Sequence, residues 1–353
     1  MRFITLEPQV FKKFASRHPN KSFFQTLEIA KLREKKGWGV YYFGVEDGGK
    51  LMAASMVTAK PAFLGKSVFY IPGGPLLDYE DARVVKCFFE NLKKYAKSHN
   101  GYVLHIEPYY ELIERDKDGQ IVENGFNRQK AVENLKRLGF KEVRADNPKY
   151  AFTLDIDKKT TKELFSSFKQ NTRNLINRTT KKGVSVRELK REELPKFKEI
   201  TKSTSERRHF ADKTLQYYED MYDLFAKKNQ VKYIVAEVND KIISAGMFIT
   251  YGDEVIYLFS GSEESYMKEY NAQYAVQWYM IQYSVEHHFK KYNFYGIQGL
   301  PDPNKPGYGI YKFKKGFGAK YGKVVELIGA YEAPIDPLFY NLHHLIRKIK
   351  PKK

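Results

Sequence analysis

The sequence predicts an α/β protein built from two similar domains. Its 353 residues are more than one ordinary domain needs and are enough for two. Hydrophobic residues make up 42% of the chain, which allows a core in each half. A weak internal repeat predicts the architecture, because each half contains a β-hairpin, a third strand, an amphipathic helix and a fourth strand.

The first copy of the repeat begins with a hairpin in residues 40–59, where VYYFGVED and LMAASMVTA flank a GGK turn. SVFYIPG, from Ser67, is the expected third strand. Apolar residues recur at helical spacing over 84–96, and Cys87, the one cysteine, is expected to pack in the core within this helix. YVLHIEP, from Tyr102, is the expected fourth strand.

The second copy follows the same order. KYIVAEV and IISAGMFIT flank an NDK turn in residues 232–250, EVIYLFSG begins at Glu254, and a helix is expected over Tyr274–Phe289. YNFYGI, from Tyr292, completes this copy. Outside the repeat, the patterns predict strands over Ala151–Ile156 and Val324–Ile328, and helices over Lys159–Lys182, Leu194–Ser203, Leu215–Lys227 and Pro337–Ile349.

Positive charge is both large and clustered. The formal net charge is +19, with 61 Lys and Arg against 42 Asp and Glu. Between Lys158 and Arg191 there are eleven basic residues and two Glu, and five of the seven residues in Arg347–Lys353 are basic. Such clusters predict a polyanionic partner: nucleic acid, anionic lipid or a phosphorylated molecule.

Several enzyme classes are excluded by missing motifs. The sequence lacks the GxSxG of esterases, the GxxxxGK[ST] of P-loop proteins and the HExxH of zinc proteases. A lone cysteine allows neither an internal disulfide nor a cysteine-based metal site. Lysines near the N-terminus stand where a signal peptide needs an apolar stretch, and no run approaches the roughly 20 apolar residues of a membrane span. We therefore expect a cytoplasmic protein without a metal or cofactor.

The stretch YGIYKFKKGFG, Tyr308–Gly318, mixes glycines, aromatic residues and lysines, and YNFYGIQG precedes it. This composition predicts a tight loop that brings positive charge and backbone amides to an anionic ligand.

The same residues resemble the C-terminal signature of the FemABX family of peptidoglycan aminoacyltransferases, in which an NFYG run is followed after a gap by FKKG. Further stretches resemble blocks of this family in the family's order over nearly the whole chain. These stretches are FQTLEIAK, GGPLLDY, LHIEPY, NRQKAVENLKRLGF, RNLINRTTKKGVSVR, TSERRHFADKTLQYY and NAQYAVQWYMIQYS.

The resemblance implies two GNAT-like domains related by duplication, with a cleft between them. Residues 1–150 plus 320–353 form the expected first domain, and residues 151–319 form the second. Staphylococcal members of the family carry a long antiparallel helical arm in the second half. Here the helix ending near Lys228 runs almost directly into the strand KYIVAEV, so no coiled-coil arm is expected.

The resemblance also implies a reaction, the transfer of an amino acid from aminoacyl-tRNA to the stem-peptide lysine, or the growing bridge, of a peptidoglycan precursor. UDP-MurNAc-pentapeptide and lipid II are the candidate precursors, and the basic tail suits peripheral contact with the inner membrane face. An aminoacyl ester is already activated, so the reaction needs no covalent enzyme intermediate and requires orientation, a deprotonated acceptor amine and charge stabilisation. Two alternatives stay open: a GNAT-type acyltransferase with another donor such as acyl-CoA, and a non-catalytic RNA-binding or immunity-type relative.

Positions that match the family's motifs supply the candidate site residues. Phe313 and Lys314 match the place where the acyl donor reacts, and Lys314 is expected to stabilise the oxyanion or the leaving hydroxyl. Glu107 is the acidic candidate, either as a base or as a ligand of the substrate ammonium. The expected substrate-binding residues are Lys31, Lys213, Arg207, Tyr217, Tyr102 and Tyr257, with Arg208 as an alternative anchor, and the expected tRNA-binding residues are Lys181, Lys182 and Lys315.

Overall fold

The computed structural model describes residues 1–208 and 211–349, and it divides the chain into two compact units. Unit 1 comprises Met1–Glu114, Asn124–Lys149 and Glu326–Lys353, and unit 2 comprises Arg115–Glu123 and Tyr150–Val325. Residues 350–353 of the predicted basic tail lie outside the described part of the chain.

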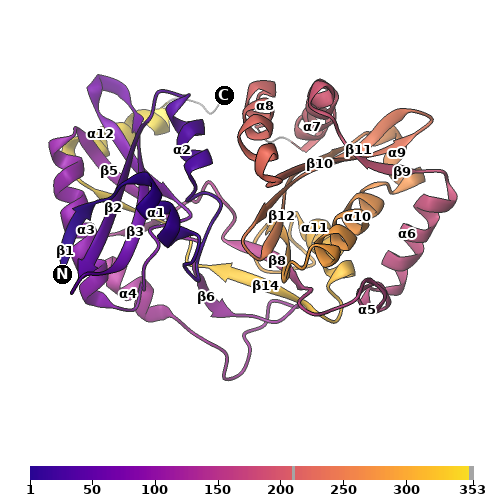
Figure 1. Ribbon diagram of the computed structural model, residues 1–353, viewed down its shortest axis with the longest axis horizontal. Helices are drawn as coiled ribbons and strands as arrows, with labels where there is room; N and C mark the ends of the chain where they lie inside the picture. The colour runs from indigo at the N-terminus through magenta and orange to yellow at the C-terminus, as the bar shows by residue number, and fades with distance from the viewer. Residues whose placement is uncertain (209–210, 350–353) are drawn as a thin grey trace. The chain divides into compact units, whose positions relative to one another are not determined.

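Unit 1 is a mixed sheet with the strand order β1-β2-β3-β4-β5-β15-β7 (Figure 1). β2, β3 and β4 pair antiparallel, and β4 pairs parallel with β5 through the crossover helix α3. This order confirms the predicted hairpin, strand, helix and strand. The strands are β1 (Arg2–Thr5), β2 (Gly39–Asp47), β3 (Lys50–Pro61), β4 (Ser67–Pro72), β5 (Gly101–Glu107), β7 (Lys141–Val143) and β15 (Ala330–Pro334), and the short strand β6 spans Glu111–Glu114.

The helices of unit 1 follow the apolar spacing of the sequence. Helix α3 begins after Asp81, whose side chain accepts the Arg83 backbone N–H at 3.0 Å, and it buries Phe88 and Phe89 against the sheet. Cys87 is half-buried against the same core, and burial raises the pKa of its thiol. The helices of unit 1 are α1 (Pro8–Ala15), α2 (Leu27–Glu34), η1 (Phe63–Gly65), α3 (Ala82–Ser98), α4 (Gln129–Arg137) and α12 (Pro337–Ile349).

Unit 2 repeats this topology. Its neighbouring strands follow the order β9-β10-β11-β12-β13-β8-β14, in which β10, β11 and β12 pair antiparallel and β12 pairs parallel with β13. A strand that is distant in the chain completes each sheet: β15 beside β5 in unit 1 and β8 beside β13 in unit 2. The strands are β8 (Tyr150–Asp155), β9 (Ser185–Glu188), β10 (Val231–Val238), β11 (Lys241–Tyr251), β12 (Glu254–Ser262), β13 (Lys291–Ile297) and β14 (Gly322–Leu327).

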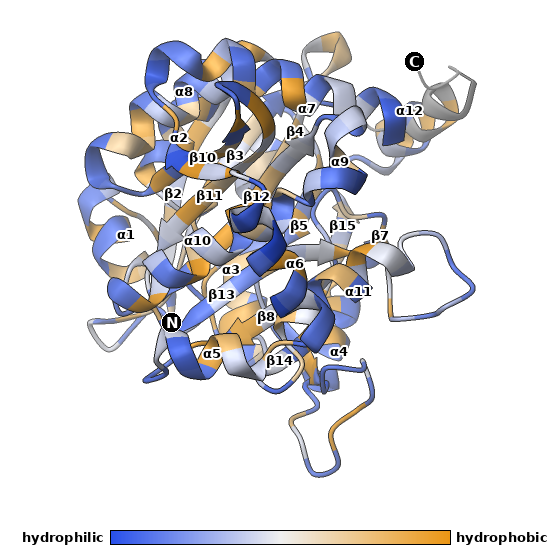
Figure 2. Ribbon diagram, turned by 90° about the vertical axis from the view of Figure 1, so that its right-hand side faces the viewer, coloured by the Kyte–Doolittle hydropathy of each residue, from blue (hydrophilic) through white to orange (hydrophobic). Residues whose placement is uncertain are grey.

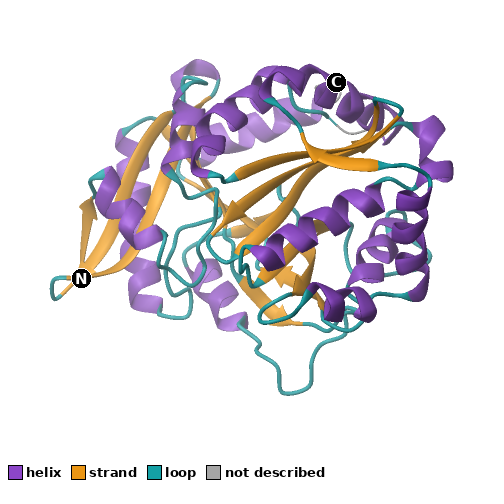
Figure 3. Cartoon of the chain, turned by 45° about the vertical axis from the view of Figure 1, so that its right-hand side comes forward, coloured by secondary structure: helices purple, strands orange, loops and turns teal. Residues whose placement is uncertain are grey.

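Helices cover both faces of the sheet in unit 2, with α7 and α8 on one face and α10 and α11 on the other (Figures 1 and 3). In Figure 2 the core strand β8 is hydrophobic, whereas α6 is largely hydrophilic. The helices of unit 2 are α5 (Thr161–Ser167), α6 (Gln170–Lys181), η2 (Arg191–Glu193), α7 (Leu194–Arg208), α8 (Leu215–Phe225), η3 (Ala226–Lys228), α9 (Glu264–Tyr270), α10 (Gln273–Glu286) and α11 (Tyr308–Phe317).

For unit 2, one prediction from the sequence is wrong and another is confirmed. The single helix expected over Lys159–Lys182 is wrong: the chain forms α5 and α6, because Phe168 leaves the helical conformation (ψ 156°) and packs its ring near Trp278. By contrast, only η3 separates α8 from β10, so the predicted absence of a helical arm at this point is confirmed.

Among the described helices, none combines the length and the apolar character that crossing a membrane would require.

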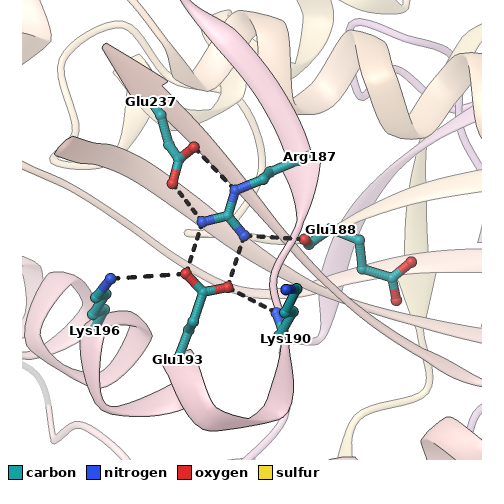
Figure 4. A network of polar contacts seen from close by, with 6 residues as sticks. All are labelled: Arg187, Glu188, Lys190, Glu193, Lys196 and Glu237. Carbon is teal, nitrogen blue, oxygen red and sulfur yellow. Dashed lines mark hydrogen bonds and ion pairs between the residues drawn. The ribbon is translucent and has the colours of Figure 1, made fainter. Parts of the chain in front are cut away.

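An arginine network attaches the edge strand β9 to β10 and to η2, which leads into α7 (Figure 4). The Arg187 guanidinium donates to Glu237 at 2.6 and 3.0 Å and to Glu193 at 2.7 Å through each of two nitrogens. Hydrogen bonds from Arg187 lower the pKa of Glu193 to about 2. The network therefore stabilises this edge while Glu193 is ionised.

We expect Arg187→Gln to lower the free energy of unfolding by about 1 kcal/mol near neutral pH, because it leaves Glu193 and Glu237 facing each other without the cation. Since the folded pKa of Glu193 is depressed, the stabilisation is present above pH 4.5 and is lost as pH falls toward 2. Thermal unfolding across this range should show a smaller acid loss in the variant than in the parent. Lys305→Gln is the matched control, because Lys305 is 72% exposed in its pair with Asp302. An equal acid loss in Arg187→Gln and the parent would contradict the argument.

Candidate active site

The parallel strands β12 and β13 stay paired over only part of their length. Glu254–Ile256 lies in register with Lys291–Asn293, although β12 continues to Ser262 and β13 to Ile297. In unit 1 the corresponding pair, β4 and β5, stays paired up to Pro72 at the end of β4. Strands that separate need other partners for their backbone polar groups, so this end of β12 and β13 is the candidate site of unit 2.

β13 leaves regular geometry where the pairing ends. Its register with β8 shifts between Asn293 and Gly296, and Tyr295 has φ +61°, an unfavourable conformation for a residue with a side chain. The buried Asn293 side chain accepts the Tyr295 N–H at 2.7 Å and donates to Glu254 Oε1 at 2.7 Å. Asn293 and Glu254 thus fix the bulge. Neither residue is among the predicted site residues, although Asn293 stands in the NFYG run.

Lys314 occupies this bulge from helix α11. Its Nζ donates to the carbonyl of Gly296 at 2.5 Å and to that of Tyr295 at 3.3 Å, and the residue is only 5% exposed. Burial lowers the pKa of Lys314 to about 7. An amine with this pKa is present in both protonation states near neutral pH, which suits proton transfer and donation to a developing negative charge.

The loop predicted over Tyr308–Gly318 is wrong, because these residues form helix α11. Tyr311, Lys314 and Phe317 lie at helical spacing on its buried face. Gly316 serves close packing rather than a turn: a Cβ there would lie 2.3 Å from Thr172 Oγ1. Phe313 is half-buried, with its ring 4.9 Å from that of Tyr274.

A chain of buried and half-buried polar groups continues from β12 to the surrounding elements. Gln273 Nε2 donates to the Tyr257 hydroxyl at 2.8 Å, and Ser244 Oγ donates to Gln273 Oε1 at 2.6 Å. Ser262 Oγ lies 2.8 Å from Ser244 Oγ, and its backbone N–H donates to Thr204 at 3.0 Å. Burial raises the pKa of Tyr257, so its hydroxyl stays protonated. Tyr257 therefore lies within a network of neutral hydrogen-bonding groups.

Lys213 and Tyr217 come together at the start of α8. Lys213 is exposed, and its Nζ lies 5.6 Å from the centre of the Tyr217 ring and 5.9 Å from that of Phe259. Arg207, in the last turn of α7, lies 3.5 Å from the Ser262 carbonyl and 4.0 Å from Glu264. Lys213 and Arg207 thus place two positive charges beside the hydrogen-bonded chain that runs from Tyr257 to Thr204.

Glu107 ends strand β5 in unit 1, and four donors reach its carboxylate. They are His105 Nε2 at 3.1 Å, the backbone N–H groups of Asp146 at 2.8 Å and Asn147 at 3.2 Å, and the Asn147 side chain. Burial acts to raise the pKa of Glu107, but the hydrogen bonds outweigh it and hold the pKa below its usual value. These contacts favour a positioning role for Glu107 over acceptance of a proton.

His105 lies between two carboxylates, with Nδ1 2.9 Å from Glu332 and Nε2 3.1 Å from Glu107. Burial acts to lower its pKa, but the two carboxylates raise it to about 9. Tyr102, also expected to bind substrate, is buried and has its hydroxyl 2.9 Å from His343 Nδ1. Lys31, on α2, is exposed.

The three lysines expected to bind tRNA differ in their surroundings. Lys181 is exposed at the end of α6. Lys182 lies 3.6 Å from Glu269, and Lys315 forms an ion pair with Asp118 and lies 5.5 Å from the Tyr311 ring. Ion pairs also involve Lys159, Arg187 and Arg191 of the basic stretch, so part of its charge is neutralised within unit 2.

Over residues 1–208 and 211–349, no three His, Cys, Asp or Glu side chains gather in a way that could hold a metal ion.

The duplicated topology, with a parallel strand pair that separates beside a buried amine, is that of a protein with two GNAT-like domains. The FemAB family model matches residues 6–241 and 234–348. The chain belongs to the FemAB family.

Individual relatives agree with this assignment. Aminoacyltransferase FemA of Staphylococcus aureus (strain N315) is 27% identical over 423 aligned positions that cover 100% of both chains. The alignment is 70 positions longer than the 353 residues of this chain, so FemA has insertions relative to it. A crystal structure of FemX has a TM-score of 0.81 at 21% identity, covering 97% of this chain and 99% of its own. A tandem GNAT protein from the clavulanic acid biosynthesis pathway has a TM-score of 0.57 at 12% identity, covering 95% and 98%. The two structures show the same fold.

Proposed function

We propose that this protein transfers an amino acid from aminoacyl-tRNA to the stem-peptide lysine, or the growing bridge, of a peptidoglycan precursor. The acceptor is UDP-MurNAc-pentapeptide or lipid II. The observation that carries the proposal is the buried Lys314 amine, with a pKa of about 7, at the point where β12 and β13 separate. Membership of the FemAB family and the activity named for the FemA relatives support the aminoacyl group as the one transferred.

The reaction is aminolysis of an ester. The acceptor amine attacks the ester carbonyl, a tetrahedral intermediate with an oxyanion forms, and the bond to the ribose oxygen breaks. The amine loses one proton, and the leaving oxygen gains one. Two N–H groups of Lys314 are directed to the carbonyls of Tyr295 and Gly296, and its ammonium form has a third for the oxyanion or the leaving oxygen.

Other side chains are proposed to bind and orient the substrates. Lys213 and Arg207 of unit 2 would bind a phosphate of the precursor, and Tyr217 would keep Lys213 in place through its ring. Lys31 of unit 1 is proposed separately as a phosphate ligand. Phe313 and Tyr257 would shape the site around Lys314. Tyr102 and Glu107 would act through the hydrogen bonds that order β5 in unit 1.

The charged donor would meet Lys181 and Lys182 at the end of α6 and Lys315 of α11. Lys181 is proposed to contribute more than Lys182 or Lys315, because each of the latter already has a carboxylate neighbour. The alternative donor, acyl-CoA, is favoured by one observation, the likeness of the fold to a tandem GNAT protein.

We expect RNase treatment to abolish transfer and to leave precursor binding intact, because the tRNA carries the reacting ester. Donor affinity should fall with salt, with a log-log slope of about −0.7 to −0.9 per phosphate neutralised. The assay combines the full chain, charged tRNA and UDP-MurNAc-pentapeptide, with mass spectrometry of the product. Lys181→Glu with Lys182→Glu should weaken the donor more than the acceptor. Full transfer after RNase, or turnover of acyl-CoA without RNA, would contradict the proposal and support the alternative.

A further inference from the structure

The last helix of unit 1 presents leucines to solvent. Leu338 is 85% exposed, Leu345 57% and Leu342 45%, and their spacing of i, i+4 and i+7 places them on one face of α12. Leu64, in η1, is 79% exposed and has φ +53°. These four are the most exposed leucines in the part of the chain that the structure describes. A cluster of this kind is typical of a surface that binds something apolar.

The opposite face of α12 is held firmly on unit 1. The Phe339 ring lies 4.9 Å from that of Tyr102 and 4.5 Å from that of Phe63. Tyr340 donates to Glu332 at 2.8 Å, and His343 contacts the Tyr102 hydroxyl at 2.9 Å. Phe339, Tyr340 and His343 therefore anchor one face of the helix to unit 1. This orientation turns the three leucines toward solvent. Phe63 is the neighbour of Leu64, so η1 brings its exposed leucine close to α12.

Positive charge accompanies this apolar face. The sequence from Pro337 to Lys353 contains no Asp or Glu, and five of the residues in Arg347–Lys353 are Lys or Arg. Exposed leucines on a helix that leads into a basic segment are typical of helices that lie in the interface of an anionic membrane. Thirteen residues of helix extend about 20 Å, too short to span a hydrocarbon core of roughly 30 Å.

We propose that Leu338, Leu342 and Leu345 of α12, together with Leu64, dock on an anionic lipid bilayer. A second copy of the chain is disfavoured as the occupant, because two chains of net charge +19 would bring like charges together. Nucleic acid is disfavoured because single strands are bound by aromatic stacking and cations, whereas aliphatic leucines gain little from a polyanion. This inference goes beyond the proposed reaction and does not depend on it. A protein held in this way would meet lipid-linked acceptors at the membrane.

The test is co-sedimentation of the full chain with vesicles that contain no peptidoglycan precursor. We expect binding to phosphatidylglycerol–phosphatidylcholine vesicles, weaker binding as salt rises, and little binding to pure phosphatidylcholine. Leu338→Ser with Leu342→Ser and Leu345→Ser should lower the affinity about tenfold or more. Leu338→Glu alone should lower it several-fold. Since the leucines are exposed, the thermal midpoint should stay near that of the parent.

The matched control is Ile121→Ser with Leu300→Ser, which removes exposed apolar side chains from unit 2 and should leave vesicle binding unchanged. Equal binding by the parent and the triple leucine variant would overturn the inference, as would equal binding to anionic and neutral vesicles. A triple variant that changes only the oligomeric state in light scattering, or only tRNA binding, would overturn it too. Because transfer is not measured, an error in the proposed function would leave these results intact.

Discussion

We expect Lys314→Met to lower turnover by about 10² or more, the usual cost of removing one donor to a developing oxyanion. Methionine keeps the length and much of the volume of the buried stem and removes the amine. The carbonyls of Tyr295 and Gly296 then lose their donor, which costs about 1–3 kcal/mol of stability and is partly offset because no amine has to be buried. Steady-state kinetics and thermal unfolding should therefore report a large loss of kcat and a modest change of midpoint.

Lys312→Met is the control on the same helix, because Lys312 is exposed. It should keep the activity of the parent. An active Lys314→Met would mean that Lys314 only fills the bulge of β13, and equal losses in both variants would point to the charge of α11 as a whole.

The pH dependence of activity should identify Lys314 further. With a pKa of about 7 set by burial, its ammonium form is lost as pH rises through 7, so kcat of the parent should fall there. Stability should change in the opposite direction. A lysine in the unfolded chain titrates near ~10.4, so the unfolded state binds more protons between pH 7 and about 10, and the free energy of unfolding rises over that window. Lys314→Met should lack both changes. A parent whose activity is flat through pH 7 would contradict this assignment.

The architecture could be predicted because its patterns are local. Alternation in the two hairpins and helical spacing over 84–96 depend only on neighbouring residues, and both copies of the repeat are found in the structure. Helix α11 was missed because glycine suggests a turn, whereas Gly316 is needed for contact with Thr172 across two helices. That contact is tertiary, so composition alone could not reveal it.

The candidate site was predictable in its parts and not in its geometry. The resemblance pointed to Lys314, but its burial and its two carbonyl partners depend on the bulge at Tyr295, which side-chain bonds of Asn293 maintain. Likewise, Glu107 was identified by its motif, whereas the backbone donors of Asp146 and Asn147 come from a loop about forty residues later in the chain. The spacing of one motif carries no information about such partners.

We expect Asn293→Asp to destabilise unit 2 by about 3 kcal/mol near neutral pH, roughly 10 °C in the thermal midpoint. An aspartate can still accept the Tyr295 N–H, but its second oxygen replaces the amide that donates to Glu254 Oε1 at 2.7 Å. Two buried carboxylates then face each other, and Lys291, 3.2 Å from Glu254, compensates only one of them. The effect should shrink as pH falls, because one carboxyl takes up a proton and donates as the amide did.

Thermal unfolding of this variant between pH 5 and 8 provides the measurement, with Asn177→Asp on the exposed surface of α6 as the control of equal charge. The control should unfold like the parent at every pH. Asn293→Asp should also lose activity through kcat more than through KM, since the bulge positions the carbonyls that hold Lys314. A variant as stable and as active as Asn177→Asp would show that the bond between Asn293 and Glu254 does not maintain the bulge, and Tyr295 would then owe its left-handed conformation to the packing of α11 alone.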